Sequence, residues 1–368
     1  MKKLSEIFKQ RLLDVINNND LDDKTMNHIL GILSSFTPEE LDEVIEFFNK
    51  KGLSMYHKQL IDIFQKYNLK SILKTLSEGE SIELNDLLIK TDNIYSGNIY
   101  DIIIKKFGSF DDENNIRKCL QKLAALDFKN KNSRGIFEIL LELFLGGERI
   151  DTDGDITRPN YRMEVKGPTG RMIGQYDTNI QNMAEGVKGY VSTWDIDIDH
   201  LIEEKGVFSS NKSINKLFNG EDSLCKYLNT NNLFTLIQWA LICQFEGNPK
   251  HFDDQLIKKL QIGDEIKNAI IKEINGQIRY VDAAKLRILM GCVQLYYYKQ
   301  KDKFSHIIIF KGSSKENSVS RGDYIILDEN NLNNINTLWG IVNKYNIHFE
   351  LGGRKGSSRD NACQIMIK

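Results

Sequence analysis

The sequence predicts an α/β protein with a mainly helical N-terminal domain at residues 1–130 and an α/β domain at residues 131–368, the latter carrying a helical insertion at about 195–300. Apolar residues recur at helical spacing in the first part. Residues 131–190, by contrast, contain nine of the chain's 26 glycines and two of its four prolines, as expected where backbone turns sharply or approaches a ligand. Continuous apolar runs near the C-terminus then indicate buried strands.

The clearest helix signal lies at residues 37–52. Thr37 is placed to cap the helix, Pro38 takes the first helical position, and Glu40 completes a capping box. Gly52 follows the last turn. Similar apolar spacing predicts helical segments at residues 26–36, 60–76 and 116–128.

The C-terminal third alternates strand and helix signals. The runs HIIIFKG (306–312) and YIILD (324–328) predict buried strands, residues 331–346 predict a helix, and two more strands follow around Phe349 and in residues 363–368. This alternation predicts the α/β part of the fold.

Composition narrows the function classes. A formal net charge of −2 argues against a protein that coats nucleic acid through bulk charge. No apolar run is long enough to cross a membrane, and the five cysteines form no C-x-x-C pair, so neither a disulfide framework nor a thiolate zinc site is expected. The expected compartment is a reducing cytoplasm, which would be the host cytoplasm or the virion if the chain is phage-encoded.

The segment DGDITRPNYRMEVKG (153–167) predicts a β-hairpin. Pro159-Asn160 is a favourable turn pair, and a loop centred there places Asp155 opposite Glu164 and Asp153 opposite Lys166.

Strand alternation then puts Glu164 and Lys166 on one face, and Met163 and Val165 on the other, where they can pack into a core. Directly opposed carboxylates destabilise a sheet unless positive charge lies between them. Oxygen ligands of this kind suit Mg²⁺ or Mn²⁺, and Lys166 can orient water or stabilise charge on a phosphate.

These residues resemble the PD-(D/E)xK nuclease superfamily, in which an acid on a preceding helix is followed by an Asp and by E-x-K on the next strand. The resemblance covers residues 134–190, although Gly154 stands where the family usually has Pro. It implies a restriction-endonuclease-like mixed sheet flanked by helices, and a Mg²⁺-dependent deoxyribonuclease. By this resemblance Asp155, Glu164 and Glu138 bind metal, and Lys166 is the catalytic lysine.

The helix before the hairpin also offers Glu142, one turn after Glu138. Glu138 fits the family's placement better, and Glu142 is expected to be an exposed surface carboxylate. Basic residues at Arg171, Arg354 and Lys355 are candidate contacts for DNA phosphates.

Two other interpretations compete with a nuclease. Asp155 and Glu164 can point into water, with Asp153 and Lys166 as a surface ion pair. The chain can also be a non-catalytic structural, assembly or DNA-binding protein, viral in one version, that keeps a nuclease-like fold. In the leading nuclease interpretation, the N-terminal helices are candidates for contact with DNA, with a protein partner or with a second copy of the chain.

Overall fold

The computed structural model describes residues 37–67, 69–108, 112–124, 135–147, 155–167, 171–172, 215, 218–220, 223–226, 228–245, 254–312, 322–350 and 363–367. The chain divides into two compact units, each described by itself below. The first comprises Met1–Gly167 with Lys315–Ile325, and the second Pro168–Ser314 with Ile326–Lys368. The boundary expected at residue 130 lies within the first unit, so the predicted hairpin belongs to the same unit as the N-terminal helices.

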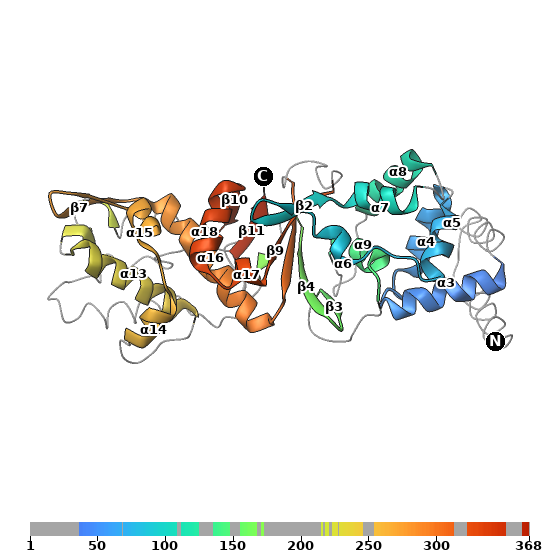
Figure 1. Ribbon diagram of the computed structural model, residues 1–368, viewed down its shortest axis with the longest axis horizontal. Helices are drawn as coiled ribbons and strands as arrows, with labels where there is room; N and C mark the ends of the chain where they lie inside the picture. The colour runs from blue at the N-terminus through green and yellow to red at the C-terminus, as the bar shows by residue number, and fades with distance from the viewer. Residues whose placement is uncertain are drawn as a thin grey trace, which may run out of the picture. The chain divides into compact units, whose positions relative to one another are not determined.

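Short helices dominate the first unit (Figure 1). They are α3 (Pro38–Lys50), α4 (His57–Lys66), α5 (Lys70–Ser77), α6 (Leu84–Leu87), α7 (Ile99–Phe107), α8 (Glu113–Ala124) and α9 (Ile136–Phe144). The predicted capping box of α3 is confirmed: Thr37 Oγ1 accepts from the Glu40 amide at 3.2 Å, and the Glu40 carboxylate accepts from the Thr37 amide at 2.9 Å. The cap therefore satisfies backbone donors that a helix start leaves unpaired.

The core of this unit reaches from the early helices to α9. Phe64 of α4 and Phe107 of α7 both pack against Phe144 at the end of α9. The centre of the Phe144 ring lies 6.4 Å from that of Phe64 and 5.7 Å from that of Phe107. All three rings are almost completely buried. The helix that precedes the hairpin is thus fixed by aromatic packing to the helices before it.

Six strands form one sheet in the order β1-β2-β9-β8-β4-β3. Their bounds are β1 (Lys90–Thr91), β2 (Ile94–Asn98), β3 (Ile156–Arg158), β4 (Tyr161–Lys166), β8 (His306–Phe310) and β9 (Asp323–Asp328). β8 and β9 coincide with the two apolar runs predicted as strands, and residues 307–310 and 324–327 are all buried, as in strands covered on both faces. The predicted α/β class is confirmed.

The second unit joins helices to a small sheet of order β10-β11-β5. Besides β8 and residues 326–328 of β9, its elements are β5 (Arg171–Met172), η2 (Leu224–Lys226), α13 (Thr230–Phe245), α14 (Asp254–Lys259), α15 (Asp264–Ile270), β6 (Ile271–Ile274), β7 (Gln277–Val281), α16 (Ala283–Asp302), α17 (Glu329–Leu332), α18 (Ile335–Lys344), β10 (Ile347–Glu350) and β11 (Cys363–Ile367). The hairpin β6-β7 interrupts the stretch expected to be a helical insertion.

Asn275 and Gly276 make that hairpin possible, because both adopt positive φ, at 54° and 74°. This conformation at two successive residues is the one that a tight two-residue hairpin turn requires.

Among the described residues, no helix is both long and apolar enough to cross a membrane.

Close packing of α16 against β10 rests on a glycine. A Cβ atom built at Gly291 would overlap the ring of Phe349, whereas one built at Gly340 of α18 would meet nothing within 4 Å. Both glycines lie inside helices.

We therefore expect Gly291→Ala to lower the free energy of unfolding by about 1–3 kcal/mol, because the added methyl overpacks the contact. Gly340→Ala, the matched control, should raise stability by up to about 1 kcal/mol, because Ala favours the helix. Denaturant unfolding of both variants measures the difference. Equal stability of the two variants would show that α16 and β10 do not pack this closely.

Candidate functional site

The hairpin β3-β4 has the predicted register. Ile156 pairs with Met163, and Arg158 pairs with Tyr161 across the turn at residues 159–160. Continued by one residue, the same register sets Asp155, which directly precedes β3, opposite Glu164.

The structure brings Asp155, Glu164 and Lys166 together at the end of this hairpin. Asp155 Oδ2 accepts a 2.7 Å hydrogen bond from the Val165 amide, and Lys166 Nζ donates to Glu164 Oε1. Glu164 and Lys166 are buried, with 6% and 8% of their surfaces exposed. Two carboxyl groups and one ammonium therefore lie together, and two of these three groups, Glu164 and Lys166, are largely shielded from water.

The pKa of the Asp155 carboxyl responds both to its burial and to the nearby charge of Glu164. Burial, then the charge of Glu164, raises the pKa of the Asp155 carboxyl to about 7, while Lys166 and the Val165 amide act in the opposite direction. A hydrogen bond from Asp155 to Glu164 also favours the protonated form. The positive charge supplied by Lys166 thus offsets the repulsion between the two acids only in part.

This arrangement rules out a solvated hairpin face. Glu164 and Lys166 do not point into water, and Lys166 pairs with Glu164 on its own strand. Asp153, its alternative partner, lies outside the described residues. Met163 is fully buried, and Val165 is buried as well, so both faces of β4 are covered.

The prediction that Glu142 is an exposed surface carboxylate is wrong. It is not an exposed surface carboxylate, since it has 0% exposure and accepts from the Arg158 guanidinium, at 3.3 Å to Oε1 and 2.8 Å to Oε2. Arg158 also donates through Nε to the Gly146 carbonyl at 2.8 Å. The signal for this pair was present, because apolar residues flank Glu142 on both sides, and a buried acid requires a partner.

Glu138 stands at the start of α9. Its Oε2 accepts from the Gly135 amide at 3.1 Å, so this buried carboxylate caps its own helix. Within the described part of the chain, no group of three or more His, Cys, Asp or Glu side chains is placed to hold a metal ion. The structure therefore does not add Glu138 to the two hairpin acids, and its role as a metal ligand stays a prediction.

The predicted phosphate contacts are not assembled into a described site. Arg171 lies in β5, where its backbone pairs with Gln364 of β11. Arg354 and Lys355 lie outside the described residues.

Comparison with known proteins identifies no relative: no family model, no curated protein and no solved structure matches the chain. The site is therefore interpreted from its own residues.

Breaking the Arg158–Glu142 pair should destabilise the first unit. In Glu142→Gln the buried guanidinium loses its counter-charge, and we expect a loss of about 3 kcal/mol in the free energy of unfolding. Glu46→Gln is the control, since Glu46 forms a 3.2 Å pair with Lys50 and its side chain is 69% exposed; it should change stability by at most about 0.5 kcal/mol. Denaturant unfolding compares the two, and similar small losses would contradict the burial of the pair.

The raised pKa of Asp155 predicts a pH dependence of stability. Between its ordinary pKa of 3.8 and its folded-state pKa of about 7, the folded protein holds a proton that the unfolded chain has released. The free energy of unfolding therefore falls as pH rises through this interval. Asp155→Asn replaces the titrating carboxyl with an amide, so the Tm of the variant should not fall for this reason. The Tm of the variant minus that of the wild type should therefore increase by about 4 °C or more between pH 4.5 and pH 7.5.

The melting curves are recorded in the presence of a chelator. Glu43→Gln, which alters an exposed carboxylate in the same unit, is the control and should follow the wild type at every pH. A constant Tm difference between Asp155→Asn and wild type would show that Asp155 does not titrate in this range.

Proposed function

We propose that the chain is a divalent-cation-dependent endonuclease that hydrolyses phosphodiester bonds in DNA. The observation that carries this proposal is the convergence of Asp155, Glu164 and Lys166 at one end of the β3-β4 hairpin. The order of these residues also resembles the PD-(D/E)xK nucleases, and the restriction-endonuclease-like form of the sheet belongs to the same proposal.

The donor set fits Mg²⁺ or Mn²⁺. Asp155 and Glu164 offer carboxylate oxygens in contact, and Mg²⁺ is commonly bound by one or two carboxylates together with water and substrate phosphate. The charge of Glu164 raises the pKa of Asp155 more than Lys166 lowers it, so a bound cation would relieve repulsion between the two acids. When bound, the ion acidifies water and offsets charge on the phosphate.

The chain's own residues supply orientation and positive charge. The Val165 amide fixes one oxygen of Asp155, and Glu164 holds the Lys166 ammonium close to both acids. An ammonium has three donors, so Lys166 can bond Glu164 and also hold a water or a phosphate oxygen. Hydrolysis joins the water oxygen to phosphorus and breaks one P–O ester bond, and donors placed near the phosphate stabilise its added negative charge.

One observation favours the second candidate, a non-catalytic structural, assembly or DNA-binding protein. Lys166 pairs with Glu164 on its own strand, as a purely structural cluster would require. Cleavage of DNA that depends on a divalent cation distinguishes the nuclease from the non-catalytic candidate. Contact of the N-terminal helices with a partner or a second copy, and a cytoplasmic location, stay predictions.

We expect the protein to nick supercoiled plasmid DNA with Mg²⁺ or Mn²⁺ and not with EDTA. Asp155→Asn, Glu164→Gln and Lys166→Met should each lower kcat/KM by roughly 100-fold or more, because each removes a charge at the reacting phosphate. Lys166→Met keeps a buried stem of similar length. Glu43→Gln should cleave like the wild type.

Melting curves of the same variants decide whether lost activity reflects lost folding. Wild-type protein that leaves plasmid intact with both cations would support the non-catalytic candidate. Full activity of Lys166→Met in a folded protein would remove Lys166 from the mechanism.

A further inference from the structure

Four consecutive backbone carbonyls at the end of α9 are all hydrogen-bonded to other parts of the first unit. Phe144 O accepts from the Ile82 amide at 2.9 Å. Leu145 O and Gly147 O accept from Lys51 Nζ, the latter at 2.9 Å, and Gly146 O accepts from Arg158 Nε at 2.8 Å. α9 ends at Phe144, so two cationic side chains from distant segments bond the three carbonyls that directly follow the helix.

Lys51 reaches this helix end from the first helix of the described chain. It is the C-cap residue of α3, it is only 7% exposed, and its Nζ lies 5.8 Å from the centre of the Phe47 ring. A buried ammonium is costly unless several groups compensate it. The negative end of the α9 dipole and two carbonyls provide that compensation.

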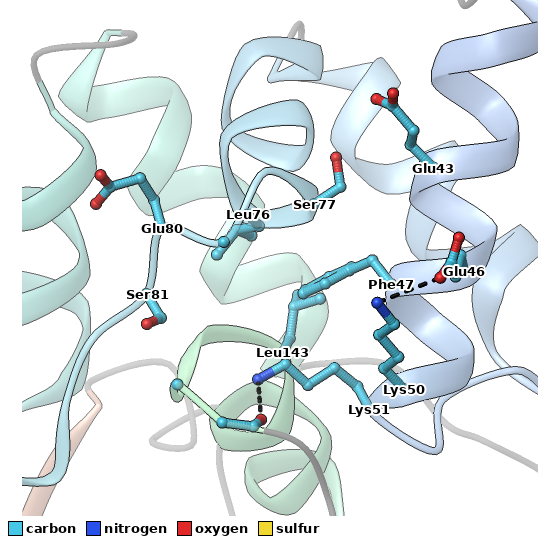
Figure 2. A pocket seen from close by; sticks show the side chains of 13 residues that line it. Glu43, Glu46, Phe47, Lys50, Lys51, Leu76, Ser77, Glu80, Ser81 and Leu143 are labelled. Carbon is cyan, nitrogen blue, oxygen red and sulfur yellow. Dashed lines mark hydrogen bonds and ion pairs between the residues drawn. The ribbon is translucent and has the colours of Figure 1, made fainter.

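The neighbouring lysine behaves differently, although both line the same pocket of about 290 Å³ (Figure 2). Lys50 pairs with Glu46 at 3.2 Å, and its side chain is 52% exposed. In Figure 2 Lys51 instead turns toward the end of α9 beside Leu143. Of these two adjacent lysines, Lys50 is thus exposed at the surface and Lys51 is buried.

Arg158 connects this helix end to the hairpin. Its Nε bonds the carbonyl between the two that Lys51 holds, and its two terminal nitrogens bond Glu142 one turn earlier in α9. Arg158 is also the last residue of β3, three positions after Asp155. Lys51, residues 145–147, Arg158 and β3 therefore form a continuous chain of contacts that leads to the site.

We propose that Lys51 is a positioning residue, which holds residues 145–147 so that Arg158 fixes the hairpin and, with it, the Asp155 and Glu164 carboxylates. The proposal rests on the proposed function for its catalytic consequence, but the geometry that it describes is independent of activity. It also assigns the N-terminal helices a direct part in shaping the site, in addition to any contact with a partner.

The hydrogen bond from the Val165 amide to Asp155 provides a local readout of that geometry. Hydrogen exchange at this amide is measured on the full chain without divalent cations. Lys51→Met removes the ammonium and keeps the stem, and we expect it to speed exchange at Val165 by at least about 10-fold. Lys50→Met is the matched control and should stay within about twofold of the wild type.

A second control separates positioning from loss of stability. Leu41 is buried in the first turn of α3, roughly 15 Å along the helix axis from Lys51. Leu41→Ala therefore weakens the unit without removing the contacts of Lys51 with residues 145 and 147. At temperatures where each variant is fully folded, Leu41→Ala should leave exchange at Val165 within about threefold of the wild type. A Lys51→Met variant that matches Leu41→Ala at Val165 would overturn the proposal.

Cation binding and kinetics test the consequence at the site. Lys51→Met should raise the Kd for Mn²⁺, measured by calorimetry, by at least about 5-fold, and lower kcat for nicking with little change in KM, because the DNA contacts are untouched. If the wild type neither binds Mn²⁺ nor cleaves, the proposed function fails, and Val165 exchange still decides the positioning role.

If Lys51→Met does not fold, Lys51→Gln is measured in its place, because its side-chain amide retains a hydrogen-bond donor. It must then speed exchange at Val165 more than Leu41→Ala does, or the proposal fails.

Discussion

The buried ion pair between Arg158 and Glu142 is the constraint on which the rest of the first unit depends. Both side chains are nearly or fully inaccessible, and separating them would leave a charge in a medium that solvates it poorly. The pair therefore ties β3 to α9 in one arrangement. Aromatic packing around Phe144 then ties α9 to the early helices, so that the hairpin and the N-terminal helices share one compact unit.

The two charge clusters of the hairpin region differ in balance, and this difference indicates where chemistry can occur. Arg158 and Glu142 are matched one to one and are joined by two hydrogen bonds, so they need nothing more. Asp155 and Glu164 lie beside the Lys166 ammonium, and burial, then the charge of Glu164, raises the pKa of Asp155 toward neutrality. A cation would add to the stability of the second cluster and disturb the first. This contrast singles out the second cluster as the proposed site.

Much of the hairpin could be predicted from sequence because its determinants are local. Pro159-Asn160 sets the turn, and strand alternation then sets the register of Asp155 against Glu164. The partners of Glu142 and Lys51 could not be predicted, because they depend on contacts between segments far apart in the chain. The β6-β7 hairpin was missed although Asn275-Gly276 is a strong turn signal, since helical spacing on both sides of it outweighed a two-residue cue. The turn and register of β3-β4 were thus readable from local residues, whereas the pairing of buried charges required the tertiary structure.

Binding of a divalent cation by Asp155 and Glu164 is tested most directly by locating the cation in a crystal. Crystals of the wild-type chain grown with Mn²⁺ would be measured at a wavelength where manganese scatters anomalously. We expect an anomalous peak within coordination distance, about 2.2 Å, of carboxylate oxygens from both Asp155 and Glu164, and its loss in Asp155→Asn. An ordered hairpin with no peak at these two residues under saturating Mn²⁺, and with Lys166 still bonded to Glu164, would contradict it.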